Sequence, residues 1–335
     1  MRVVIAPDSF KGSVPAADAA RAIARGWASE RPGDELIRLP QADGGEGTID
    51  ALEESSAGAV RRSAGPVTGP DGRPTPGEWL ELPDGTAAVE LAQMSGLPLM
   101  SELDPLGATS RGLGEVIAAA LDAGAERLIV ALGGSASTDA GLPALDALGD
   151  RVPPPGGAIL LTDVDAPLLG PRGAAAVFGP QKGADSHDVA LLEARLGEAA
   201  RLLGFDPETP GAGAAGGVGY GLAAWASRTA PGARIEPGSR YVARLTGLPA
   251  AVRGADLVLT GEGRFDEQSL TGKVVGHAIE LCREAGVPLG VIAGAVQCDP
   301  AAWSPGCWCL ALTSLAGSAR DALAAPERWL EAAGS

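Results

Sequence analysis

The chain has 335 residues, of which 45% are hydrophobic and 20% charged, so it is long enough for two domains with sizeable cores. Its formal net charge of −16 at pH 7 argues against a nucleic-acid or anionic-membrane partner. No apolar run reaches membrane-spanning length, and residues 1–5 lead straight into a polar loop, so we expect a cytoplasmic protein without anchor or secretion signal. Four cysteines and two histidines argue against a structural zinc site and are typical of reduced thiols.

The N-terminal stretch reads as two strand–loop–helix units. Residues 2–6 and 35–39 predict strands, and polar loops follow at 7–13 (PDSFKGS) and 42–48 (ADGGEGT) before helical patterns begin. Successive units of this kind predict a parallel sheet with helices on its faces. Ligands of such sheets bind at the carboxyl ends of the strands. The loop residues of interest are therefore Asp8, Ser9, Lys11, Asp43, Gly44, Gly45 and Glu46.

The pattern changes near residue 65. Residues 66–83 are rich in Pro and Gly, and residues 78–82 and 87–91 predict an antiparallel hairpin around Asp84-Gly85. The alternation of predicted strands and helices resumes after residue 255, with strands expected at 256–260, 288–293 and 309–312. If these strands join the first two, a doubly wound α/β domain is built from both chain ends, and the middle of the chain is inserted into it.

A glycine-rich loop stands at the centre of the inserted part. Residues 128–132 predict a buried strand, 133–141 (GGSASTDAG) a loop, and residues from 142 onward a helix. In this layout backbone N–H groups and a helix N-terminus can face an anion, while Asp139 could hold a metal. The loop matches neither the P-loop nor the GxGxxG pattern. A tight turn with a helix cap is an equally open alternative.

Further polar loops follow other predicted strands, at 162–167 (TDVDAP), 178–184 (FGPQKGA), 211–221 (GAGAAGGVGYG) and 261–273. Together with the earlier loops they contain many carboxylates and several lysines. Neither histidine is placed where it could form a Ser–His–Asp catalytic set. Carboxylates that hold Mg²⁺, with lysines and backbone N–H groups that neutralise phosphoryl oxygens, suit phosphoryl transfer. A carboxylate can also accept the proton of an attacking hydroxyl. Each residue alone could equally be a helix cap, part of a turn or a solvated charge.

Six separated motifs resemble the bacterial glycerate kinase family of the class I type. They occur in the same order over nearly the whole chain, at residues 6–11 (APDSFK), 42–48, 133–136 (GGSA), 178–184, 211–217 and 260–264 (TGEGR). The resemblance implies phosphorylation of D-glycerate with ATP and Mg²⁺, giving 2-phosphoglycerate or, in some members, 3-phosphoglycerate. It also implies a flavodoxin-like domain (1–65 and 250–335), an inserted restriction-enzyme-like α/β domain (66–249) and an active site in the cleft between them.

Some residues depart from the family pattern. Thr138 and Ala140 stand where relatives usually carry Asn and Gly, Ala166 replaces an Asn, and Phe265 replaces an Ile. The segment between 149 and 159 is also short. These departures leave open a kinase for another small hydroxy acid. A non-catalytic sensor of a small acid or nucleotide is a further alternative, which the many loop carboxylates argue against.

The position of the loop residues leads to specific expectations, which the resemblance itself does not assign. We expect three catalytic residues, Asp163, Asp165 and Lys11. Either aspartate could be the general base or a Mg²⁺ ligand. The expected substrate-binding residues are Asp8, Ser9, Asp43, Gly44, Gly45, Arg111, Gln181 and Lys182. Those expected to bind ATP are Gly133, Gly134, Ser135, Ser137, Gly261, Glu262 and Lys273, with Asp139 and Asp266 on Mg²⁺. We expect a monomer or homodimer that binds only small molecules.

Overall fold

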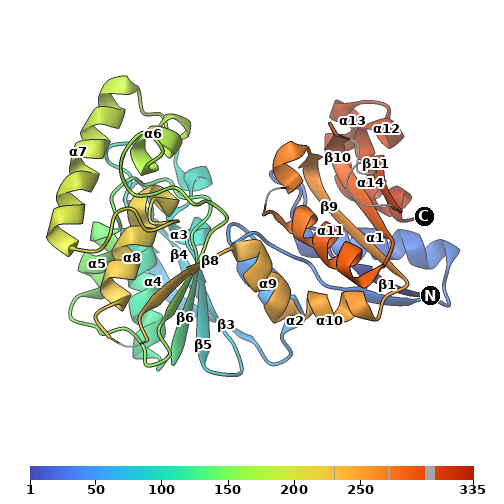
Figure 1. Ribbon diagram of the computed structural model, residues 1–335, viewed down its shortest axis with the longest axis horizontal. Coiled ribbons are helices and arrows are strands. Elements are labelled where there is room, and N and C mark those ends of the chain that lie inside the picture. Colours follow the sequence, from blue (N-terminus) through green and yellow to red (C-terminus); the bar gives the residue numbers. More distant parts are fainter. Residues whose placement is uncertain (230, 271, 299–305) are drawn as a thin grey trace. The chain divides into compact units, whose positions relative to one another are not determined.

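The computed structural model describes residues 1–229, 231–270, 272–298 and 306–335 (Figure 1). The chain divides into two compact units. Unit 1 comprises Met1–Asp43, Asp50–Ser55 and Ser239–Ser335, and unit 2 comprises Gly44–Ile49 and Ser56–Gly238. Unit 1 is therefore assembled from both ends of the chain. The boundaries expected near residues 65 and 250 fall within strand β3 (Val60–Thr68) and helix α10 (Leu248–Arg253).

Unit 1 contains a five-stranded sheet in which every pairing is parallel. The order is β2-β1-β9-β10-β11. Its strands are β1 (Arg2–Ile5), β2 (Glu35–Arg38), β9 (Leu257–Phe265), β10 (Leu289–Val296) and β11 (Cys307–Ala311). Counted along the chain this is the order 2-1-3-4-5 of flavodoxin-like sheets, which confirms the doubly wound parallel fold. The order reverses between β1 and β9, where such sheets open a ligand crevice.

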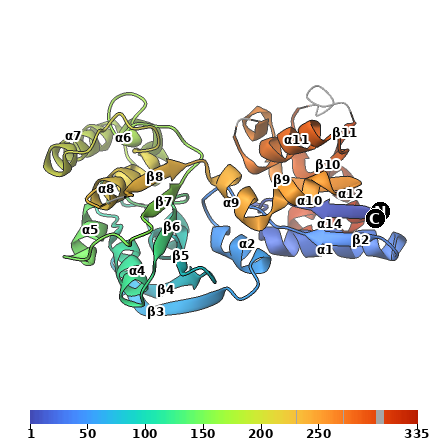
Figure 2. The ribbon, with the colours of Figure 1, turned by 60° about the horizontal axis from the view of Figure 1, so that its bottom comes forward.

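Helices cover both faces of this sheet, as Figure 2 shows for α1 and α14 on one face and α10 and α11 on the other. Alternate β1 residues point to opposite faces, so Val3 and Ile5 join one core and Val4 and Ala6 the other. The helices of unit 1 are α1 (Ala16–Glu30), α10, α11 (Val274–Ala285), α12 (Leu312–Ala316), α13 (Ala319–Ala324) and α14 (Pro326–Gly334), with the 3-10 turn η4 (Glu267–Leu270). The chain passes between the units after Asp43, within α2 (Thr48–Ser55), directly after α2, and after the first residue of α9 (Gly238–Thr246).

The last strand, β11, differs from expectation. A strand was expected at residues 309–312, whereas β11 spans Cys307–Ala311 and is the edge of the sheet. Trp308 on it is 41% exposed, because an edge strand has only one covered flank. The four cysteines carry thiols and form no disulfide among the described residues.

Unit 2 contains a mixed six-stranded sheet whose order follows the sequence, β3-β4-β5-β6-β7-β8. Its strands after β3 are β4 (Pro74–Glu81), β5 (Thr86–Glu90), β6 (Arg127–Ala131), β7 (Ala158–Leu161) and β8 (Ala233–Glu236). The pairings β3–β4 and β4–β5 are antiparallel, and the others are parallel. The hairpin expected around Asp84-Gly85 is confirmed as β4–β5, and Gly85 takes the positive φ of +78° that its turn requires.

The helices of unit 2 are α3 (Ala92–Ser95), α4 (Arg111–Asp122), α5 (Leu142–Leu148), α6 (Ala174–Phe178), α7 (Ser186–Leu203) and α8 (Val218–Ala226), with the 3-10 turns η1 (Leu97–Leu99), η2 (Pro180–Lys182) and η3 (Ala214–Gly217). Residues of α4 and α8 share one core with alternate residues of β5, β6 and β7, so these two helices cover the same face of the sheet. Leu113, Val130 and Trp225 lie in its main core. Among the described residues, none of the helices combines the length and apolarity needed to cross a bilayer.

Candidate functional site

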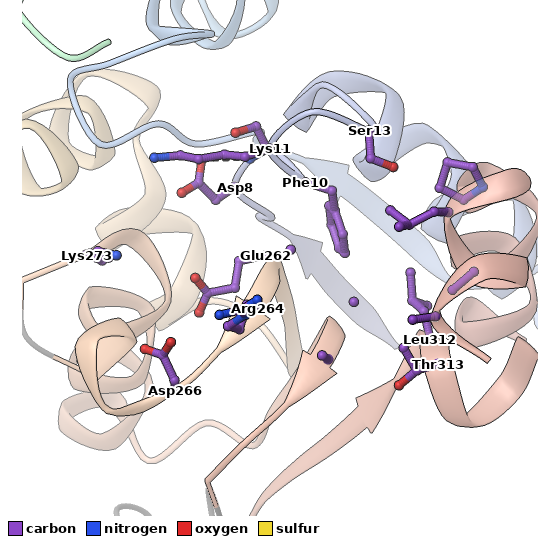
Figure 3. Close-up of a pocket in the computed structure, with 18 of the residues that line it drawn as sticks. Asp8, Phe10, Lys11, Ser13, Glu262, Arg264, Asp266, Lys273, Leu312 and Thr313 are labelled. Carbon is purple, nitrogen blue, oxygen red and sulfur yellow. Dashed lines mark hydrogen bonds between the residues drawn. The ribbon is translucent and has the colours of Figure 1, made fainter. Parts of the chain in front are cut away.

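Unit 1 contains a cavity of about 450 Å³ (Figure 3). It is lined by the loop after β1 (residues 8–11 and 13) and by Asp43. Residues 262–264, 266 and 273, residues 294–295 of β10, and residues of α12, α13 and α14 complete the lining. Strands β1 and β9, whose carboxyl ends lead into the cavity, flank the point at which the strand order of the sheet reverses. The cavity therefore occupies the place where doubly wound folds bind their ligands.

The backbone of the loop after β1 fixes the Asp8 carboxylate in this cavity. The Asp8 N–H donates to the Gly261 carbonyl oxygen at 2.8 Å, which extends the pairing of β1 with β9. Two residues later, the Phe10 N–H donates to the Val14 carbonyl at 2.8 Å and closes a tight turn. Gly12 in that turn has a φ of +71°, a value that favours glycine. Asp8 is left only 8% exposed.

Two carboxyl groups of the cavity have strongly raised pKa values. Burial, followed by the charges of Asp43 and Glu262, raises the pKa of Asp8 to about 8, although the Ser9 N–H and Lys11 oppose this. Burial also raises the pKa of Glu262 to about 7, with a smaller contribution from Asp266. The Glu262 Oε1 atom is buried and has no hydrogen-bond partner among the described residues. Both carboxylates would be stabilised by an added cation.

Positively charged side chains lie on the same side of the cavity. Figure 3 shows Lys11 and Lys273 there with Asp8, Glu262 and Asp266. Lys11 Nζ lies 3.6 Å from Asp43 Oδ2. Lys273 is the N-cap residue of α11, where the positive end of the helix dipole adds to its ammonium charge. The polar side of the cavity therefore combines acids for a cation with lysines for an anion.

The donor set fits Mg²⁺ supplied together with a phosphate ligand. Carboxylate oxygens are the hard ligands that Mg²⁺ prefers, and the unpartnered Glu262 Oε1 would gain one. In the part of the chain that the structure describes, no three His, Cys, Asp or Glu side chains form a ready metal site. This agrees with the usual way Mg²⁺ binds in kinases, through one or two carboxylates, water and substrate phosphates.

The glycines of unit 2 allow two loops to pack backbone against backbone. The Gly133 N–H donates to the Gly44 carbonyl at 3.0 Å, and a Cβ atom at Gly133 would come within 2.5 Å of the Gly45 Cα atom. Gly134 adopts a φ of +80°. Close packing therefore explains the glycines at 44, 45 and 133 without a ligand.

A buried ion cluster stabilises the glycine loop from within unit 2. Lys182 is 2% exposed, and its Nζ donates to the Ser137 carbonyl at 2.5 Å. Burial lowers the pKa of Lys182 to about 8, which the charge of Asp139 opposes. Asp139 accepts the N–H groups of Ser110 at 2.7 Å and Gly141 at 2.9 Å, and burial raises its pKa. Both carboxylate oxygens of Asp139 thus bind backbone donors.

The other expected residues of unit 2 lie in more open surroundings. Asp163 is partly buried and Asp165 exposed, just beyond the end of β7, and Gln181 is exposed on η2. Arg111 pairs with Glu115 at 3.2 Å and with Asp146 at 2.6 Å, so its guanidinium is already held by carboxylates. The Ser135 hydroxyl lies 3.3 Å from the Ser137 carbonyl, inside the loop.

The structure thus sorts the expected residues into two sets. In unit 1, one cavity is lined by Asp8, Ser9, Lys11, Asp43, Glu262, Asp266 and Lys273. Gly261 accepts the Asp8 N–H through its carbonyl oxygen. The remaining residues lie in unit 2, at the loops described above. Position after a strand was the signal that identified most of the first set. It missed Arg264, which lies two residues after Glu262 on β9, therefore on the same face of the strand, and also lines the cavity.

Sequence reasoning also missed Glu90, at the end of β5. This side chain is buried, and its carboxylate accepts the N–H groups of Gly47 at 3.0 Å and Ile49 at 3.2 Å, at the start of α2. A negative charge near a helix N-terminus is stabilised by the helix dipole. An acidic residue that ends an otherwise apolar strand was the available signal.

Comparison with known proteins identifies the family. The model of the Glycerate kinase family matches residues 3–157 and 156–335. The glycerate kinase of Bacillus subtilis (strain 168) is 40% identical over 336 residues, covering 89% of this chain and 86% of that protein. The glycerate 2-kinase of Escherichia coli (strain K12) is 37% identical over 336 residues, covering 89% and 86%. A crystal structure assigned as a glycerate kinase 2 from Salmonella typhimurium LT2 superposes with a TM-score of 0.76 at 33% identity, covering 100% of this chain and 97% of that one. The chain belongs to the glycerate kinase family.

Proposed function

We propose that this protein transfers the γ-phosphoryl group of ATP to a hydroxyl of D-glycerate, with Mg²⁺, and that 2-phosphoglycerate is the product. Family membership supports the reaction class, and the name of the E. coli relative, glycerate 2-kinase, supports the position of transfer. The observation that carries the proposal is the unit 1 cavity. It places two buried carboxyl groups with raised pKa values beside two lysines at the ligand-binding edge of a doubly wound sheet.

On the donor side, Asp8 and Glu262 would hold Mg²⁺, with Asp266 close by, directly after the end of β9. The ion would neutralise charge on the phosphate oxygens. Lys11 and Lys273 would bind phosphate oxygens directly and keep the phosphoryl group in place. Phosphoryl transfer needs mainly positioning and charge stabilisation, so a cavity without a strong nucleophile is sufficient.

On the acceptor side, a carboxylate must take the proton of the attacking hydroxyl. We assign this role to Asp163, just beyond the end of β7, with Asp165 as the second candidate. Asp163 is partly buried, which favours a defined position, whereas Asp165 is exposed. The buried Lys182–Asp139 cluster would hold the neighbouring glycine loop in shape.

A kinase for another small hydroxy acid is the second candidate. Two local departures from the family pattern described above support it: Ala166 stands in place of Asn, and the connection between 149 and 159 is short. Both changes lie next to β7, at whose end the proposed proton acceptor stands.

An acceptor panel separates these candidates. Initial rates of ADP formation from ATP and Mg²⁺ are measured with D-glycerate, L-glycerate, glycolate, D-lactate and tartronate. We expect kcat/KM for D-glycerate to exceed the others by at least about tenfold, because a site that binds an extra hydroxyl rejects analogues that lack it. A higher kcat/KM with another acid would overturn the assignment of glycerate, and ATP binding that is indifferent to Mg²⁺ would count against a kinase.

A further inference from the structure

The unit 1 cavity has an apolar side that the chemistry of phosphoryl transfer does not use. Phe10 and Leu312 lie on the opposite side from Asp8 and Glu262, where Ser13 and Thr313 add two hydroxyl groups (Figure 3). Ala322, Leu323 and Pro326, from α13 and the start of α14, also line the cavity. A single ligand that fills the cavity must therefore be charged at one end and apolar at the other.

The size of the cavity also indicates a ligand larger than a metal ion and a phosphate group. About 450 Å³ lies within the range of sites for cofactor-sized ligands and is more than a metal ion and a phosphate group need. A small hydroxy acid offers no apolar surface to match Leu312, Ala322 and Leu323.

Gly263 and Gly294 both line the cavity and lie opposite each other on the paired strands β9 and β10. Their pairing follows from the register, in which Glu262 pairs with Ala293 and Arg264 with Ala295. At Gly263, an added Cβ would meet only the Lys11 N atom at 3.5 Å and Phe10 backbone atoms at 3.7 Å, which are ordinary contacts. These contacts do not require glycine at 263, whereas a Cβ at Gly294 would come within 2.3 Å of the Gly263 carbonyl oxygen.

We propose that the apolar side of this cavity holds the base and ribose of the phosphoryl-donor nucleotide. The inference rests on the proposed function, since it is the triphosphate that lies among the acids and lysines. The apolar surface of a base can cover Leu323, a cavity-lining side chain that is 68% exposed in the protein alone. Burial of apolar surface on both partners then contributes to nucleotide affinity.

The test compares two ligands that share phosphates and differ in the base. Binding of Mg²⁺–ATP and of Mg²⁺–tripolyphosphate is measured by isothermal titration calorimetry, with no acceptor present. We expect wild-type protein to bind ATP at least about thirtyfold more tightly than tripolyphosphate. Leu323→Asn is expected to weaken ATP binding about fivefold to tenfold and to leave tripolyphosphate binding unchanged. The control is Leu202→Asn, a 75% exposed leucine on α7 of unit 2, which should change neither affinity.

The outcomes separate this inference from the proposed function. Equal affinities of wild-type protein for the two ligands, or an unchanged ATP affinity of Leu323→Asn, would overturn the base site. Failure to bind either ligand would overturn both the base site and ATP as donor. Base-dependent ATP binding without turnover of D-glycerate would support the base site and remove the proposed acceptor.

Discussion

Replacement of Asp8 by Asn is expected to stabilise the protein while it lowers activity. In the folded protein the pKa of Asp8 is raised to about 8, mainly by burial. The folded state therefore keeps a proton that the unfolded chain releases near pH 4, and stability falls as the pH rises from about 4 to about 8. An asparagine side chain does not titrate, so the variant loses this dependence.

The size of the effect follows from the same values. At pH 7 the buried carboxyl costs at most about 4 kcal/mol of folding free energy, because pH 7 lies about 3 units above the unfolded pKa of 3.8 and each unit costs about 1.36 kcal/mol. The amide must also be buried, so we expect about 2 kcal/mol, or a melting temperature about 4–8 °C higher at pH 7. Near pH 4 the titration of Asp8 contributes almost nothing, so only the cost of burying the amide remains and the variant should be the less stable protein by about 2 kcal/mol. Turnover should fall by roughly 100-fold, because the residue proposed to hold Mg²⁺ is lost.

The assay is thermal unfolding followed by circular dichroism from pH 4 to pH 8.5, in EDTA and without nucleotide. Asp150→Asn, at an exposed aspartate of unit 2, serves as the control and should leave the melting temperature unchanged. A lower melting temperature for Asp8→Asn at pH 8, or a gain that is equal at pH 4 and pH 8, would refute the electrostatic reasoning. Unimpaired turnover would remove Asp8 from the site.

Three further variants test the remaining assignments. Asp163→Asn should fold normally and lose roughly 100-fold or more in turnover if this carboxylate accepts the proton; unchanged turnover would exclude it. Lys273→Met should raise the KM for ATP about tenfold while Lys273→Arg retains most of the affinity, and equal behaviour of the two variants would argue against phosphate binding. Lys182→Met removes the donor to Ser137 and the cation near buried Asp139, so it should cost about 1–3 kcal/mol in urea unfolding; a stability equal to wild type would contradict the role of this cluster.

Much of the unit 1 sheet could be predicted from the sequence. Its central strands are short apolar runs that end in polar loops, and a parallel sheet brings the ends of such strands to one edge. The gathering of Asp8, Asp43 and Glu262 in one cavity follows from that geometry. The edge position of β11 could not be predicted, because strand order depends on contacts between distant segments.

Side-chain environments were harder to predict than strand positions. Asp139 looked like a metal ligand in the sequence, yet its oxygens bind the N–H groups of Ser110 and Gly141, and only the tertiary fold brings Ser110 near. Likewise, the apolar wall of the cavity comes from helices near the C-terminus, more than 250 residues away from Asp8 in sequence. No local pattern indicates such a partnership.

The most direct test of the account is ADP release from ATP and Mg²⁺ with and without D-glycerate, followed by ³¹P NMR of the product. We predict ADP release that depends on glycerate and on Mg²⁺, and a product signal coupled to a single carbon-bound proton, as in 2-phosphoglycerate. A folded protein that binds ATP but shows no stimulation by D-glycerate would contradict the proposed reaction. A product signal coupled to two protons, as in 3-phosphoglycerate, would contradict the proposed position of transfer.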